Sequence, residues 1–179
     1  MLEIEVPGRE FYDEERNEFF TMKPVTLRLE HSLVSISKWE AKWKKPFLTR
    51  EPHSLEETRD YIRCMTLNQH VAPEVYRVLT PEDINAVAEY ISAELTATTI
   101  HDSTATPTRE IVTSEVMYYW MIAYNIPIEA QKWHLSRFLT LVRICSIKNA
   151  PPKKMSRQAI LRRNTKLNEA RRKKLGTRG

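Results

Sequence analysis

The stretch VTLRLEHSLVSISKWEAKWKKP, residues 25–46, contains a change of hydrophobic period that decides the fold class. In its first part every second residue is apolar: Val25, Leu27 and Leu29. From Ser32 onwards the large apolar residues are three or four positions apart: Leu33, Ile36, Trp39 and Trp43. A period of two is typical of a half-buried strand, and a period near 3.6 is typical of an amphipathic helix. The stretch therefore predicts a strand followed by a helix, which Ser32 caps and which ends near Lys45, before Pro46.

The residues before this stretch have the pattern of further strands. Residues 2–6 (LEIEV) alternate between apolar and acidic side chains, and Pro7 and Gly8 end the alternation. Aromatic residues on both sides of the polar segment 13–17 indicate a hairpin. Pro24 fits an edge strand or the first position of a strand, because proline lacks the N–H group that a strand ladder needs. We therefore predict a small N-terminal antiparallel β-meander.

Four further helices are predicted after residue 50. Residues 54–57 (SLEE) form a capping box, and residues 80–83 (TPED) combine an N-cap, a proline at the first helical position and early acids. Residues 114–124 are apolar almost all round, which predicts a central buried helix with Trp120 at its centre. Residues 135–147 follow the i, i+3, i+4, i+7 pattern. The predicted fold class is α+β, with the strands packed on a bundle of four to five helices.

The charge of the chain is divided unevenly between two segments. The 179 residues carry a formal charge of +5. Eleven of the 28 Lys and Arg residues and one of the 23 Asp and Glu residues lie beyond residue 150, so residues 151–179 carry +10 and the rest carries −5. Pro151 and Pro152 mark the boundary, because proline ends a preceding helix. We predict a single α+β domain at 1–150 and a basic helical or flexible tail at 151–179, capped by Ser156 where it is helical.

The composition excludes several classes of protein. The mean hydropathy is −0.50, and no apolar run approaches the roughly 20 residues that are needed to cross a bilayer. The presence of only three glycines argues against a glycine-rich phosphate loop. Two isolated cysteines favour a reducing cytosol over a disulfide framework. The acidic, alternating N-terminus is unlike a signal peptide, so we expect no leader sequence.

The reactive residue types form no catalytic or ligand-binding constellation in the sequence. His101 and Asp102 resemble the dyad of metal phosphohydrolases, but two adjacent residues in a Thr-rich segment also fit a solvated turn. Cys64 and Cys145 lie on apolar helical stripes without a neighbouring base. We therefore expect no enzyme activity, no cofactor and no metal site, and we assign no catalytic residue.

Trp39 and Trp43, one helical turn apart, are candidate partner-binding residues. Tryptophan is enriched in the hot spots of protein interfaces. The commoner role of two tryptophans on one helix face is burial in the core, because they supply most of the apolar area that such a helix can bury. We favour the core and keep partner binding as the alternative.

The basic tail supplies the other candidate partner-binding residues. They are Lys153, Lys154, Arg157, Arg162, Arg163, Arg171, Arg172, Lys173 and Lys174. A Lys- and Arg-rich arm gains affinity for nucleic acid by releasing condensed counterions, although this arm lacks the aromatic residues that would stack on bases. Two other interpretations are docking on an acidic partner, or on the protein's own acidic domain, and a solubilising tail that orders only on binding.

Three stretches resemble a known protein family. They are residues 29–48 (LEHSLVSISKWEAKWKKPFL), 118–121 (YYWM) and 148–155 (KNAPPKKM). Similar segments occur in the same order in small proteins of long-tailed phages, which are identified as tail assembly chaperones of siphophages. The resemblance implies a non-enzymatic protein of the host cytoplasm that keeps the tape measure protein soluble while tail tube subunits polymerise around it. Some relatives are made in two lengths by ribosomal frameshifting.

A compact domain with a charged arm also suits two other functions. One is a structural virion component, such as a tail or connector protein, which should assemble into a stable ring. The other is a phage nucleic-acid-binding protein, whose affinity should fall with salt. The expected partners are therefore the tape measure protein and the tail tube protein, with nucleic acid as a partner of the tail and no membrane contact.

Overall fold

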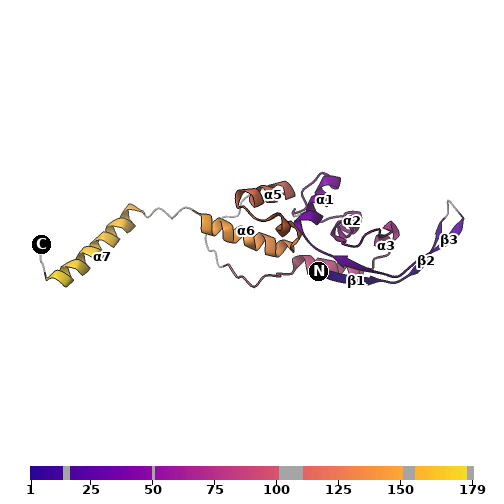
Figure 1. The fold of residues 1–179 in the computed structure, drawn as a ribbon, viewed down its shortest axis with the longest axis horizontal. Coiled ribbons are helices and arrows are strands. Elements are labelled where there is room, and N and C mark those ends of the chain that lie inside the picture. Colours follow the sequence, from indigo (N-terminus) through magenta and orange to yellow (C-terminus); the bar gives the residue numbers. More distant parts are fainter. Residues whose placement is uncertain (14–16, 50, 101–110, 151–155, 177–179) are drawn as a thin grey trace. The chain divides into compact units, whose positions relative to one another are not determined.

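The computed structural model of the chain describes residues 1–13, 17–49, 51–100, 111–150 and 156–176. The chain divides into two compact units, Met1–Ser146 and Ile147–Gly179. The first unit begins with strands and continues with helices, so the predicted α+β class is confirmed (Figure 1). The division lies just before the boundary that the two prolines predict after residue 150.

The N-terminal strands form one long antiparallel hairpin with an interruption in each arm. The strands are β1 (Leu2–Val6), β2 (Arg9–Asp13), β3 (Glu18–Met22) and β4 (Val25–Leu29). β1 pairs with β4, and β2 pairs with β3. Val6 lies opposite Val25 and Arg9 lies opposite Met22, so both pairs share one register. The strands are antiparallel as expected, but they pair as nested hairpin arms and not as the predicted meander, because alternation shows which face is buried and not which strand is the partner.

The inner half of the hairpin is anchored on the helices, and the outer half extends beyond them (Figure 1). Leu27 and Leu29 of β4 are fully buried. The edge of β4 that does not pair with β1 is covered by a later segment of the chain. The Leu67 N–H donates to the Arg28 carbonyl there, at 2.8 Å. Between the two halves, a Cβ on Gly8 would lie 2.8 Å from the Met22 carbonyl oxygen, so the close approach of the arms requires glycine.

Helices α1 (Leu33–Trp43) and α2 (Leu55–Met65) begin where their capping residues predict. The Ser32 hydroxyl accepts a hydrogen bond from the N–H of Ser35 at 3.3 Å. The Ser54 hydroxyl accepts one from the N–H of Glu57 at 3.2 Å. Each cap satisfies a backbone donor that the first helical turn leaves without a partner. Lys44, the C-cap residue that follows α1, adopts the left-handed conformation with φ 57°.

Two further helices follow α2. α4 (Pro81–Ser92) starts as predicted, with Thr80 as its N-cap and proline at its first position. The short helix α3 (Pro73–Arg77) was not predicted. It places Tyr76 in the core, where the side chain is buried. Its five residues are too few for a helical hydrophobic period to be recognised in the sequence.

The predicted central position of Trp120 is wrong. Trp120 lies on α5 (Ser114–Ala123), followed by the 3₁₀-helix η1 (Ile128–Lys132) and by α6 (Leu135–Asn149). Its side chain is half-buried at the edge of the core. Tyr119 and Ile122 of the same helix are 65% and 77% exposed. An all-round apolar pattern allows burial on every side, but it does not supply a neighbour for each side.

The core of the first unit is built from its N-terminal strands and from its helices. Its largest fully buried side chains are Trp39, Phe138, Leu27, Leu29, Leu33, Ile36, Ile62, Met65 and Met117. They come from β4, α1, α2, α5 and α6, so the strand pair β1–β4 and the helices share one apolar core. Trp39, and not Trp120, is the tryptophan at its centre.

The second unit contains α7 (Arg157–Leu175). Ser156 caps this helix as predicted, its hydroxyl accepting from the Ala159 N–H at 3.2 Å. Gly176 follows the last turn with φ 63°. No residue of α7 is buried. The described part of the basic tail is thus helical over residues 157–175, and no side chain of this helix is packed into a core.

Candidate functional site

The two candidate tryptophans face α2. Trp39 is fully buried, and its indole N–H donates to the Glu57 carbonyl at 3.0 Å. Trp43 is half-buried, and its indole N–H donates to the Asp60 carboxylate at 2.8 Å. The two rings are stacked with 6.0 Å between their centroids. Trp39 is therefore a core residue that a partner does not reach in this fold, and Trp43 offers only part of its surface.

Ion pairs continue the contact between α1 and α2. Lys42 Nζ lies 2.7 Å from Asp60 Oδ1, and Lys45 pairs with Glu57. The hydrogen bond from Lys45 is the main cause of the lowered pKa of Glu57. Burial alone would raise the pKa of Asp60, but the hydrogen bonds from Lys42 and Trp43 hold this pKa below its usual value. Both acids are ionised at neutral pH, so Asp60 holds α2 to α1 and Glu57 holds α2 to Lys45, which lies just after α1.

A buried chain of polar groups contains residue types that are common in catalysis. His31 Nδ1 lies 2.5 Å from the Tyr61 hydroxyl, which lies 3.2 Å from the Ser35 hydroxyl. Burial lowers the pKa of His31 to about 4 and raises the pKa of Tyr61. All three side chains are buried, so a substrate in solution does not reach them. The chain of hydrogen bonds satisfies polar groups within the core, and the sequence gives no periodic signal for it.

Large apolar side chains are exposed where α5 meets η1. A hollow there is lined by Tyr118, Met121, Ile122, Asn125, Ile126 and Ile128. Ile122 is 77% exposed and Ile128 is 57% exposed. Tyr119, one turn before Ile122 on α5, is 65% exposed. We call Tyr119, Ile122 and Ile128 the α5–η1 surface, and grouped exposure of this kind is typical of a site that binds another protein.

The basic candidate residues that the structure describes all lie on α7 and are exposed. They are Arg157, Arg162, Arg163, Arg171, Arg172, Lys173 and Lys174. Lys153 and Lys154, like the His101 and Asp102 pair, lie outside the described residues.

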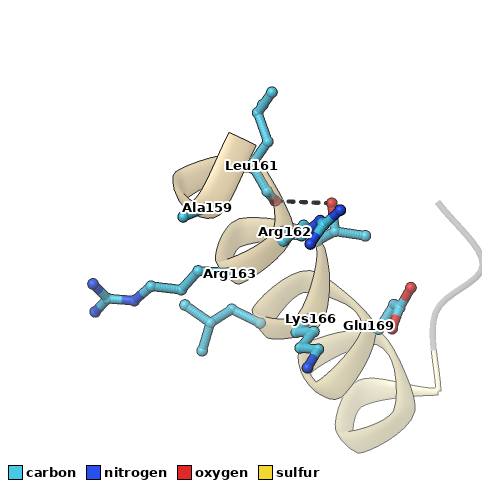
Figure 2. Close-up of a pocket in the computed structure, with 8 residues that line it drawn as sticks. Ala159, Leu161, Arg162, Arg163, Lys166 and Glu169 are labelled. Carbon is cyan, nitrogen blue, oxygen red and sulfur yellow. Dashed lines mark hydrogen bonds between the residues drawn. The ribbon is translucent and has the colours of Figure 1, made fainter. Parts of the chain in front are cut away.

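A hollow is also found on α7, where it is an open helix surface and not an enclosed site. Figure 2 shows its lining side chains, all of which come from α7 itself. Thr165 donates to the Leu161 carbonyl at 3.0 Å, so even its hydroxyl is used within the helix. Because a single helix cannot surround a ligand, α7 is best described as a strongly basic surface.

A cleft between α1, α2 and α3 brings together cations from three separate segments of the sequence. It is lined by Lys42, Leu55, Glu56, Arg59, Asp60, Arg63, Pro73, Tyr76 and Arg77. Arg59 and Arg63 are four residues apart on α2, so the sequence shows that they share one helix face. Arg77 comes from α3, whose position is set by tertiary packing, so the cleft could not be found from the sequence.

Comparison of the chain with protein-family models, with curated proteins and with solved structures found no match. Among the described residues, no three His, Cys, Asp or Glu side chains are grouped so that they could hold a metal ion. None of the helices in the described ranges has both the length and the apolar character that crossing a membrane requires.

Proposed function

We propose that this protein is a non-enzymatic tail assembly chaperone of a long-tailed phage, which acts in the host cytoplasm on the tape measure protein and assists tail tube assembly. The α5–η1 surface is the observation that supports the proposal most. A long helical partner has apolar faces that self-associate until the tube encloses them, so its helper must cover these faces reversibly. An exposed apolar hollow beside a helix suits this task, because an amphipathic helix lays its apolar face into such a groove.

The family resemblance and the α5–η1 surface coincide in the chain. The stretch YYWM, residues 118–121, lies within α5. Tyr118 and Met121 line the hollow, and Tyr119 is exposed beside it. The stretch 29–48 instead contains α1 and core residues such as Trp39. The stretch 118–121 is therefore our candidate for the partner contact. The stretch 29–48 instead supplies residues that build the core.

The proposal is tested by co-expression with the phage's tape measure and tail tube proteins, followed by pull-down. Ile122→Asp places a charge in the α5–η1 surface, and burying an unpaired charge in an interface is costly. We expect this variant to capture at least about tenfold less tape measure protein, which corresponds to about 1.4 kcal/mol. Leu67→Asp is the matched control, because Leu67 is an exposed apolar residue that does not line the hollow.

Salt separates the proposed apolar contact from a purely ionic one. The pull-down is repeated at about 50 and 200 mM salt, a range over which phosphate-driven binding falls steeply. Capture that persists at the higher salt and is lost in Ile122→Asp alone supports the proposal. Equal capture by both variants contradicts it. Recovery of the protein in purified virions would instead indicate a structural tail or connector component.

Nucleic-acid binding through α7 is the second candidate function. The observation that favours it is the charge of α7, which carries eight exposed Lys and Arg residues and a single acid, Glu169. Affinity for duplex DNA, followed by fluorescence anisotropy, should fall with a log–log salt slope of about −0.9 for each phosphate neutralised. Tight, salt-sensitive binding without any effect on the tape measure protein would replace the chaperone proposal with this one.

A further inference from the structure

The cleft between α1, α2 and α3 combines a cationic rim with apolar walls. Its volume is about 600 Å³, which lies within the range of roughly 300–1,000 Å³ that is usual for ligand sites. The apolar contributions are Leu55, Pro73 and Tyr76. The cationic contributions are Lys42, Arg59, Arg63 and Arg77. Two acids, Glu56 and Asp60, complete the lining. Cations therefore outnumber acids in the cleft, although residues 1–150 carry a net charge of −5.

Asp60 neutralises only part of this positive charge. Its carboxylate lies 2.7 Å from Lys42 Nζ and 2.9 Å from an Arg63 guanidinium nitrogen. It also accepts the indole hydrogen bond of Trp43 at 2.8 Å, so its lone pairs are largely occupied. Within the described part of the chain, Arg59 and Arg77 form no ion pair with an acid, and neither does the exposed Glu56 at the rim.

Arg59 has an unsatisfied donor inside the protein. Its Nε is buried and has no hydrogen-bond partner among the described residues. The guanidinium is permanently charged and has only donors to offer. A buried donor without an acceptor is rare in native proteins, and it is more costly when the group is charged. No hydrogen bond or ion pair joins the Arg59 side chain to another described residue, so its guanidinium has donors to offer to an anion in the cleft.

We propose that this cleft binds an anionic ligand whose carboxylate or phosphate group is held by Arg59 and Arg77 and whose apolar part packs on Leu55, Pro73 and Tyr76. Guanidinium groups match the geometry of both oxyanions and bind them through paired hydrogen bonds. The cleft shares no residue with the α5–η1 surface. Anion binding in this cleft therefore does not depend on the proposed chaperone function, and each can be tested without the other.

The proposal is tested by NMR titration of the full chain with three probes of similar apolar size. Phenyl phosphate and phenylacetate each carry one of the two anionic groups, and benzyl alcohol is the neutral control. We expect at least one anion to give saturable shifts of the Arg59 Nε–H signal and of backbone signals in α2 and α3. The better of the two anions identifies the ligand chemistry. Benzyl alcohol should give no saturable shift.

Charge-matched variants show whether the shifts arise in the cleft. Arg59→Gln and Arg77→Gln should each weaken anion binding at least fivefold, measured on the backbone signals of α2. Lys132→Gln removes one exposed charge on η1, away from the cleft lining, and should leave the affinity unchanged. Arg77 is exposed, so its variant tests the proposal even if Arg59→Gln does not fold. Absence of saturation with both anions, shifts confined to α7, or equal weakening in all three variants would overturn it.

Discussion

At the scale of single residues, His31 makes the stability of the first unit dependent on pH. The side chain is 2% exposed, and its ring centroid lies 5.3 Å from that of His134. Burial and the nearby His134 lower the pKa of His31 to about 4. Because an unfolded histidine titrates near pH 6.5, the unfolded state takes up a proton at a higher pH than the folded state does. The stability that this difference provides is present above pH 6.5 and is lost as the pH falls towards 4.

Replacing His31 should remove this part of the pH dependence. We expect the wild-type chain to lose on the order of 3 kcal/mol through His31 between pH 7 and pH 4, since each pKa unit corresponds to about 1.4 kcal/mol. Whatever its stability at pH 7, His31→Gln should lose correspondingly less on acidification. The measurement is urea unfolding of both chains at several pH values. Parallel pH profiles for the two chains would contradict the assignment.

Glu40 is a second buried residue whose role can be measured. Its carboxylate accepts from the Phe47 N–H at 2.8 Å and from the Ser114 N–H at 2.7 Å, so it joins the loop after α1 to the start of α5. Glu40→Gln replaces one acceptor oxygen by an NH₂ group and leaves a buried donor unpaired, at an expected cost of about 1–3 kcal/mol. Glu89→Gln on the exposed face of α4 should change the unfolding free energy by less than about 0.5 kcal/mol. Equal effects of the two substitutions would show that the Glu40 bridge contributes nothing.

At the scale of elements, α1 and not α5 forms the centre of the core. Trp39→Ala removes a fully buried indole and the hydrogen bond to Glu57, and should cost about 3–5 kcal/mol. Trp120→Ala removes a half-buried side chain, and we expect a cost nearer about 1–2 kcal/mol. Chemical denaturation of both variants measures the difference. A larger loss for Trp120→Ala would place the centre of the core on α5.

Helix α7 should be dispensable for folding of the first unit. None of its residues is buried, so its removal deletes no core contact. Its apolar side chains are sparse, so they offer little area that could be buried against a core. A chain ending at Ala150 should therefore keep the melting temperature of the full chain, as followed by circular dichroism. A large drop would mean that α7 docks on the domain through residues such as Ile160 and Leu167.

At the scale of the whole molecule, the features that follow from local sequence could be predicted and those that depend on distant neighbours could not. Ser32, Ser54 and Thr80 were identified as helix caps because a cap is decided within four residues of chain. The exposure of Ile122 and the pairing of β1 with β4 depend on segments far away in the sequence. Local patterns do not contain that information.

Among the candidate sites, too, some could be predicted from local sequence and others depend on tertiary packing. The basic residues of α7 were identified from composition alone, because a run of exposed charge needs no tertiary context. Trp39 illustrates the opposite case, since its spacing fitted both an interface and a core until its neighbours were known. The cleft around Arg59 depends on α3, whose five residues gave no helical signal.

The most direct test of the proposed chaperone function is the fraction of tape measure protein that stays in solution after centrifugation. The protein is added at an equimolar ratio, as the wild-type chain, as Ile122→Asp or as Leu67→Asp. We expect the wild-type chain and Leu67→Asp to raise the soluble fraction several-fold at about 200 mM salt, where phosphate-driven contacts are weak. Ile122→Asp should leave the tape measure protein in the pellet. The same low soluble fraction with and without the wild-type chain would contradict the proposal.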